Sequence, residues 1–163
     1  MALVRPIIIQ AVDASLPQWQ RRLFPRAMSS PFGDYYLASY TVRCDRAEIR
    51  LLARRSVPGE PRATEIVFSG VAAYHFEHDT FGTVLGHVVE QPLEPFLYEH
   101  SQEFAAGFRQ SGWPSFWSGS VGDALAWLQA GSVRSFGIDS AVGMRGWVLA
   151  RDFQSHAASE MAD

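Results

Sequence analysis

Polar and apolar residues alternate along much of the chain, most clearly over residues 47–55. Ala47, Ile49, Leu51 and Ala53 fall on one side of this alternation, and Glu48, Arg50 and Arg54 fall on the other. Successive side chains of a β-strand point to opposite faces, so the pattern predicts a strand with one buried and one exposed face. The aromatic and β-branched stretch from Tyr35 to Cys44 precedes it, and the two segments together predict a β-hairpin.

Other runs of β-branched and aromatic residues predict further strands. They span residues 4–12, 64–77, 83–89, 133–139 and 144–153. Gly70 interrupts the longest run, which indicates a bulge or a close approach of the backbone at that point. The proline- and glycine-containing stretch 56–62 is typical of a turn.

Apolar residues recur at helical spacing between Pro92 and Gly112, which predicts one helix there. A second helix is expected to begin after Ser120 and to end before Gly131. Near the N-terminus, Ser15 and a glutamine three residues later form a capping-box pattern, which predicts a short helix through about Phe24.

Strands, then helices, then strands, with short connections, predict an α+β fold. We expect a mainly antiparallel β-sheet with an N-terminal helix and two later helices. The chain has 163 residues, 47% of them hydrophobic, which is enough for one well-cored domain. We therefore expect a single α+β domain over residues 1–153 and a flexible C-terminal tail over residues 154–163, where no apolar period is present.

Composition excludes several function classes. All 14 basic residues are arginines, so mechanisms that need a lysine, such as a Walker phosphate loop or a Schiff base, are impossible. A net charge of −3 argues against a general nucleic-acid binder. The single Cys44 excludes an internal disulfide and a four-thiolate metal site. No apolar run is long enough for a membrane span or a signal peptide, so we expect a cytoplasmic protein with no membrane partner.

One polar cluster has the residue types of a metal site. His75, Glu77 and Asp79 would share a strand face, and His87 lies on the next predicted strand. These four residues would serve a metal-dependent hydrolase. However, polar residues collect at strand ends without any such role, and the zinc-enzyme spacing His-Glu-x-x-His is absent. We therefore expect no bound metal and no cofactor, and we assign no catalytic residue.

Charge is distributed unevenly along the chain. Six arginines lie between Arg43 and Arg62, whereas residues 63–106 carry seven carboxylates and no arginine. The carboxylates of the first predicted later helix are Glu94, Glu99 and Glu103. They could attract a basic protein partner through long-range electrostatic steering. The alternative is that they only form the solvated face of a helix.

Aromatic residues are concentrated in the loop between the two later helices. Trp113 and Trp117 lie close to Pro114, and exposed tryptophans of this kind often carry much of the binding energy of an interface. The alternative is a small additional core beneath the loop, because each ring buries about 150–250 Å². An exposed aromatic surface would also suit a homo-oligomeric structural protein.

Two short segments carry a family resemblance. These are Phe68–Val71 with Tyr74 and His75, and Gly146–Ala150. Over about Tyr35–Phe153 the chain resembles a loose group of small bacterial proteins, some of which are, or occur beside, immunity partners of polymorphic toxins. This resemblance implies an α+β fold and a binding role, and it carries no catalytic residue. We therefore interpret the chain as a protein-binding domain such as an immunity-type inhibitor, with the hydrolase and the homo-oligomer as alternatives.

Overall fold

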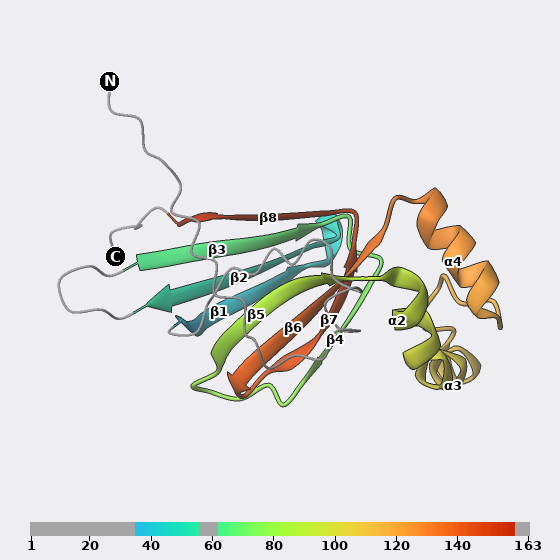
Figure 1. The fold of residues 1–163 in the computed structure, drawn as a ribbon, viewed down its shortest axis with the longest axis horizontal. Coiled ribbons are helices and arrows are strands. Elements are labelled where there is room, and N and C mark those ends of the chain that lie inside the picture. Colours follow the sequence, from blue (N-terminus) through green and yellow to red (C-terminus); the bar gives the residue numbers. More distant parts are fainter. Residues whose placement is uncertain (1–34, 56–61, 159–163) are drawn as a thin grey trace, which may run out of the picture.

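The computed structural model describes residues 35–55 and 62–158. Within these residues, eight strands form one antiparallel sheet and three α-helices gather at one end of it (Figure 1). The prediction of an α+β fold with a mainly antiparallel sheet is therefore confirmed. The predicted strand over 4–12 and the predicted N-terminal helix over 15–24 lie outside the described residues, as does most of the predicted turn, residues 56–61.

The sheet has the strand order β4-β7-β6-β5-β1-β2-β3-β8. In chain order the strands are β1 (Tyr35–Arg43), β2 (Glu48–Arg55), β3 (Arg62–Ser69), β4 (Ala73–Glu77), β5 (Val84–Gln91), β6 (Arg134–Val142), β7 (Arg145–Ala150) and β8 (Asp152–Ala157). The helices are α2 (Leu93–Glu99), α3 (Ser101–Ser111) and α4 (Val121–Ala130), and a single 3-10 turn η1 (Cys44–Arg46) joins β1 to β2.

The predicted hairpin is present as β1 and β2, which pair antiparallel with Tyr40 opposite Leu51. Ile49 and Leu51 are fully buried, and Arg54 on the opposite face is exposed. The predicted buried and exposed faces of β2 are therefore confirmed. Ala47 is an exception to the predicted buried set, because it ends η1 in a left-handed conformation (φ 47°) and is exposed.

Two of the predicted strands are each divided in two. The stretch 64–77 forms β3 and β4, which are separated at Gly70 (φ +64°), and the stretch 144–153 forms β7 and the start of β8, which are separated at Arg151. The two breaks lie against each other, because the amide of Arg151 donates a 3.0 Å hydrogen bond to the carbonyl of Ser69. A Cβ atom at Gly70 would come within 2.9 Å of the Arg151 side chain. Gly70 thus permits the close approach that its position in the sequence indicated.

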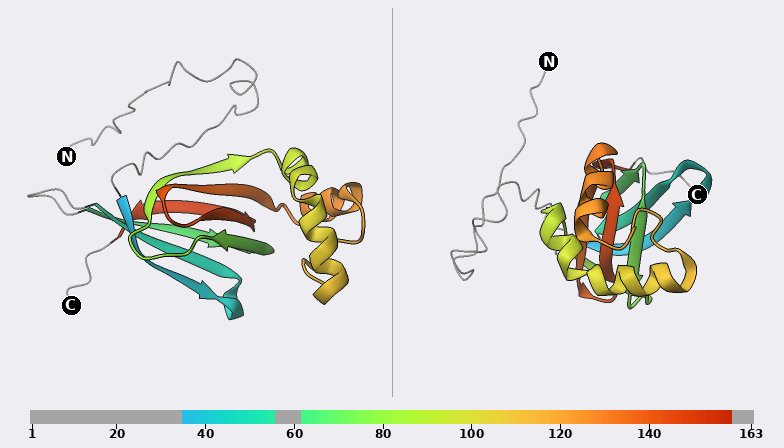
Figure 2. Two further views of the ribbon diagram at one scale, coloured as in Figure 1. Left: turned by 90° about the horizontal axis from the view of Figure 1, so that it is seen from below. Right: turned by 90° about the vertical axis from the view of Figure 1, so that its right-hand side faces the viewer.

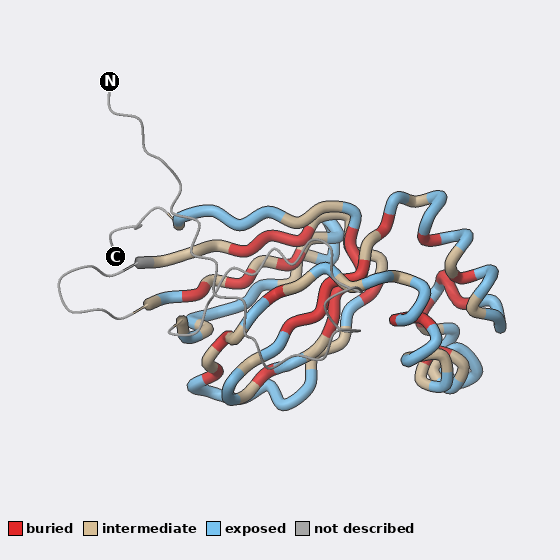
Figure 3. The backbone as a smooth tube through the Cα atoms, viewed as in Figure 1, coloured by how far each residue is buried: buried red, intermediate tan, exposed pale blue. Residues whose placement is uncertain are grey.

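The prediction of a flexible tail from residue 154 is wrong for residues 154–157. These residues belong to β8, which pairs with β3 from Ser69↔Asp152 to Thr64↔Ala157. Their side chains are exposed, so they show no apolar period (Figure 3). Backbone pairing holds this segment, and hydrophobic periodicity does not report backbone pairing.

The sheet curls into two layers, β4-β7-β6-β5 and β1-β2-β3-β8, which face each other across the main core (Figure 2). Phe68 of β3 and Phe136 of β6 meet across this core, with ring centroids 5.6 Å apart. At the breaks described above the chain passes from one layer to the other. The outer face of the first layer is covered by the helices at one end, and no element of the described residues covers the rest of that face, which we call its open part (Figure 2).

The predicted helix over 92–112 is also divided. It bends at His100 (φ −94°, ψ 6°), so α2 and α3 replace one helix and the later helices number three among the described residues. The second later helix is present as α4, whose first turn is capped by a 3.1 Å hydrogen bond from the Asp123 amide to the Ser120 hydroxyl. No helix among the described residues has the length and apolar character to cross a membrane.

A second core lies between the helices and the outer face of β7. Its fully or nearly fully buried members are Ala73, Phe96, Leu97, Phe104, Phe116, Trp117, Ala124, Leu128, Val133, Trp147 and Leu149. This core fixes the corner between α2 and α3 against the sheet. The open part of the same sheet face begins directly beside that corner.

Candidate functional site

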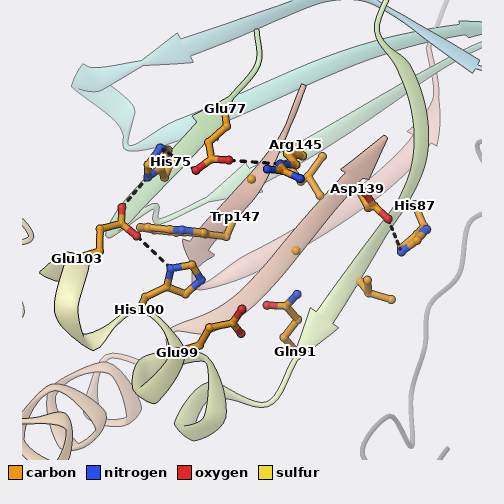
Figure 4. Close-up of a pocket in the computed structure, with 14 residues that line it drawn as sticks. His75, Glu77, His87, Gln91, Glu99, His100, Glu103, Asp139, Arg145 and Trp147 are labelled. Carbon is orange, nitrogen blue, oxygen red and sulfur yellow. Dashed lines mark hydrogen bonds and ion pairs between the residues drawn. The ribbon is translucent and has the colours of Figure 1, made fainter. Parts of the chain in front are cut away.

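A cavity of about 440 Å³ lies where the corner between α2 and α3 meets the open face of the first layer (Figure 4). Four strands contribute one cross-sheet row of side chains to it. His75 on β4 pairs with Trp147 on β7, Trp147 pairs with Gly137 on β6, and Gly137 pairs with Val89 on β5. Because paired residues of adjacent strands point to the same face, these positions all face the cavity. We call this cavity the acidic pocket, for the carboxylates described below.

The next row of the same face carries opposite charges. Glu77 is paired with Arg145, whose Nε lies 3.3 Å from a Glu77 carboxylate oxygen. On the other side of the pocket, His87 is paired with Asp139, and the His87 Nε2 lies 3.6 Å from the carboxylate. Sheet register therefore places two carboxylates on the pocket wall, and each already has a neighbouring cationic or imidazole group.

Two glycines of the sheet allow close packing at the pocket. A Cβ atom at Gly146 would collide with the backbone carbonyl of His75, so β4 and β7 approach each other closely there. A Cβ atom at Gly137 would collide with the side-chain amide of Gln91, which lies over this position. Glycine at position 137 thus leaves room for the Gln91 side chain on the pocket face, and glycine at position 146 permits the close approach of β4 and β7.

The rim opposite the strands is supplied by the bend between α2 and α3. The bend preserves helical hydrogen bonds on both sides, since the His100 amide bonds to Phe96 and the Phe104 amide bonds to His100. Glu99, His100 and Glu103 therefore reach the pocket from adjoining turns (Figure 4). The predicted acidic helix face is thus divided, because Glu94, one turn earlier, is exposed and does not line the pocket.

Glu103 joins two histidines from different elements. One carboxylate oxygen lies 2.6 Å from Nδ1 of His75 on β4, and the other lies 3.0 Å from Nδ1 of His100 (Figure 4). A carboxylate only accepts hydrogen bonds, so each Nδ1 atom carries the hydrogen. In its neutral form each ring then presents Nε2 as an acceptor. The Nε2 atom of His75 lies 3.9 Å from Glu77.

Trp147 forms the base of this arrangement. It is 5% exposed, and its ring lies 6.0 Å from that of His75 and 5.6 Å from that of His100, measured between centroids. Both imidazoles are therefore held by Glu103 on one side and by an aromatic surface on the other. Their side chains keep 37% and 25% of their surface exposed, so they are accessible from the pocket.

The pocket carries an excess of negative charge. Its lining contains the four carboxylates Glu77, Glu99, Glu103 and Asp139 and the single guanidinium of Arg145. The Glu77 carboxylate is paired with Arg145, whereas the Glu99 carboxylate makes no hydrogen bond or ion pair with the described residues. An exposed carboxylate without a partner, beside other carboxylates, attracts a cation.

The predicted metal-site residues are not all brought together. His75, Glu77 and His87 line the pocket, but Asp79 accepts a 2.7 Å hydrogen bond from the Tyr40 hydroxyl elsewhere. The reason is that β4 ends at Glu77 and His78 adopts a left-handed conformation (φ +53°), which breaks the alternation assumed for this strand. The described part of the chain contains no group of three or more His, Cys, Asp or Glu side chains that could hold a metal ion.

The two predicted surface tryptophans lie in or against the second core. Trp117 is 4% exposed, and its ring lies 5.7 Å from that of Phe104. Trp113 is half-buried and stacks on Trp147 at 6.2 Å. Trp117 therefore has little surface to offer a partner, which is the arrangement expected for an additional core beneath the loop.

Several pocket residues were not among the predicted site residues. His100, Arg145, Asp139 and Trp147 belong to this group. His100 continues the apolar period of the predicted helix, so no sequence pattern indicated that it faces a cavity. The isolated glycines of β6 and β7 were the available signal, because glycine inside a strand indicates a close approach of backbone or ligand.

Comparisons of the chain with family models, with curated proteins and with solved structures gave no match.

Proposed function

We propose that this chain is a protein-binding domain that recognises a basic partner, and that the acidic pocket receives a cationic side chain of that partner. The observation that carries this proposal is the unpaired carboxylate of Glu99 beside Glu103 and Asp139. Because Arg145 is already paired with Glu77, the pocket itself supplies no cation for Glu99.

An arginine side chain suits the pocket better than a compact cation. Its planar guanidinium donates hydrogen bonds in several directions and can pair with a carboxylate through two parallel bonds. The Nε2 atoms of His75 and His100 are acceptors in the neutral rings and offer further partners for its N–H groups. The volume of about 440 Å³ lies within the range of pockets that enclose small organic groups.

An immunity-type inhibitor is the most concrete form of this proposal. Such an inhibitor must find its target quickly, and a patch of one charge sign raises the association rate with an oppositely charged partner. The acidic pocket supports this interpretation because its negative charge is local, whereas the net charge of the whole chain is only −3. The resemblance noted for Phe68–Val71 and Gly146–Ala150 agrees with this form.

The two alternatives have less support. A metal-dependent hydrolase would use His75, Glu77, Asp79 and His87, and Asp79 is bonded to Tyr40 outside the pocket. A homo-oligomer built on Trp113 and Trp117 would need aromatic surface that is largely taken up by the second core.

The proposal is tested by selecting randomised peptides on the immobilised chain and comparing their affinities for two variants. Glu99→Gln removes the unpaired carboxylate, and Glu94→Gln removes an exposed carboxylate of the same helix that lies outside the pocket. We expect the selected peptides to be rich in arginine. We expect their affinity to fall about threefold to tenfold with Glu99→Gln, as for one lost ion pair of about 1 kcal/mol, and to stay unchanged with Glu94→Gln.

Two results would contradict the proposal. The first is a selection that yields no peptides or yields peptides without an excess of basic residues. The second is an equal loss of affinity in both variants, because general charge reduction would then explain the effect without the pocket.

A further inference from the structure

β4 is an edge strand. It stands at one end of the strand order and pairs only with β7 among the described strands (Figure 1). Its other edge therefore has no strand partner in the described part of the chain. An edge of this kind presents backbone N–H and C=O groups to an incoming strand.

Two neighbouring cavities meet at β4. Glu77 lines only the acidic pocket and Tyr74 and Phe76 line only a second cavity of about 600 Å³, whereas His75, with Glu103 of α3, lines both. Tyr74 and Phe76 share the second face, as their ring centroids are 5.2 Å apart. We call the second cavity the side groove. The two cavities thus adjoin at His75, and strand alternation directs Glu77 to the acidic pocket and Phe76 to the side groove.

The side groove opens between the two sheet layers. Its lining combines side chains of the main core, namely Val42, Ile49, Val71 and Phe76, with charged side chains such as those of Arg43 and Glu48. One end is closed by a 2.8 Å hydrogen bond from the Val71 amide to the Ala47 carbonyl. Phe76, on its lining, is also in contact with Tyr40 of β1, with ring centroids 5.6 Å apart. An apolar side chain placed in the groove would therefore extend the existing core.

We infer that the partner contributes an extended segment that adds as a strand to the free edge of β4, with cationic side chains directed to the acidic pocket and apolar side chains directed to the side groove. This inference rests on the proposed function. It specifies the sequence pattern of the partner segment, which alternates basic and apolar residues because side chains of a strand alternate with a period of two.

A second copy of this chain does not fit the same edge as well. Pairing of two β4 strands would bring the acidic faces of both copies together, including Glu77 and the nearby Glu103. Like charges opposite each other destabilise a strand pair. A basic segment from another protein meets no such repulsion.

Three synthetic peptides of identical side-chain composition test the inference. The first alternates arginine and valine, the second groups its arginines and its valines in separate blocks, and the third repeats the alternating sequence with N-methyl groups on alternate backbone nitrogens. Each is titrated against the full chain and against its Glu99→Gln variant. N-methylation removes the backbone donors that pair with a neighbouring strand without changing the charge.

We expect the alternating peptide to bind about tenfold more tightly than either control peptide. A difference of this size corresponds to one or two net hydrogen bonds, or to the burial of one apolar side chain. Equal binding of the alternating and N-methylated peptides, or of the alternating and blocked peptides, would overturn strand addition. If those peptides bind equally and all weaken with Glu99→Gln, the acidic pocket still binds cations and only the inference about β4 fails. If none binds more tightly to the wild-type chain than to the variant, the proposed function fails with it.

Discussion

The hydroxyl of Tyr40 on β1 donates a hydrogen bond of 2.7 Å to Asp79 in the turn after β4, and so links the two sheet layers. This hydrogen bond raises the pKa of Tyr40 above its ordinary value, with further contributions from partial burial and from the Asp79 charge. Ionisation of the phenol would remove the donor and place two negative charges side by side.

The first prediction follows from this raised pKa. The hydrogen bond stabilises the fold while Tyr40 is protonated, so its contribution is complete below the pKa of an unfolded tyrosine and is lost as the pH rises through the folded value. Asp79→Asn should lower the pKa of Tyr40, as followed by NMR of ring-labelled tyrosine during alkaline titration. Asp45→Asn, at an exposed site in η1, is the control. An unchanged Tyr40 titration in Asp79→Asn would show that the bond is absent in solution.

The second prediction concerns the close approach of β4 to β7 beside the acidic pocket. Gly146→Ala should destabilise the protein by about 1–3 kcal/mol, because the added methyl group meets the rigid backbone carbonyl of His75. Gly122→Ala on α4 is a matched control, since its Cβ atom would have no neighbour within 4 Å. That control should be neutral or stabilising by about 0.5–1 kcal/mol, as for glycine to alanine in a helix. Urea denaturation of both variants provides the measurement, and equal stabilities would mean that β4 does not approach β7 as described.

The third prediction concerns the buried face of β2. Ile49→Asp places a charge without a partner in the main core, where Ile49 is 1% exposed, and we expect an unfolded or insoluble protein. Arg54→Asp introduces the same residue on the exposed face of the same strand and should change stability by only about 0.5 kcal/mol. Circular dichroism and solubility separate the two outcomes. A folded Ile49→Asp variant with an unchanged thermal midpoint would contradict the register of β2.

The fourth prediction distinguishes two carboxylates of the acidic pocket. Glu103→Gln should lower stability by about 1 kcal/mol, because His75 and His100 bond different carboxylate oxygens and glutamine replaces one of these acceptors with an NH2 donor. Glu99→Gln should leave stability unchanged, since Glu99 has no partner among the described residues. Thermal unfolding measures both effects, and NMR of the imidazole nitrogens should report a tautomer change in the first variant only. If the two variants behave identically, Glu103 does not bridge His75 and His100 in solution.

The sequence predicted those parts of the fold that depend on local periodicity. The faces of β2 followed from Ile49, Leu51 and Arg54, and the α4 cap followed from Ser120. The division of the predicted helix at His100 was missed, because Phe96, His100 and Phe104 keep the helical spacing on both sides of the bend. A bend that keeps the helical spacing of the apolar residues cannot be detected from that spacing.

Strand alternation predicted only part of the candidate site. His75 and Glu77 do share a strand face, as alternation requires, but the left-handed conformation of His78 directs Asp79 away. The contact of Glu103 with His75 joins residues that are 28 positions apart, and it depends on how α3 packs against β4. No local pattern contains that information.

The chain crosses between the two sheet layers twice, after β3 and after β7, and these crossings determine when each layer can form during synthesis of the protein. Strands β6, β7 and β8 come last in the chain, yet β6 and β7 are interior strands of the first layer and β8 completes the second by pairing with β3. Ala73 must find Leu149, and Thr64 must find Ala157, across most of the described chain. Pairings so distant in sequence slow folding, because the intervening chain must be closed into a loop first. A chain emerging from the ribosome therefore cannot complete the first layer until β7 has been released, nor the second until β8 has been released, so both layers are completed only late in synthesis.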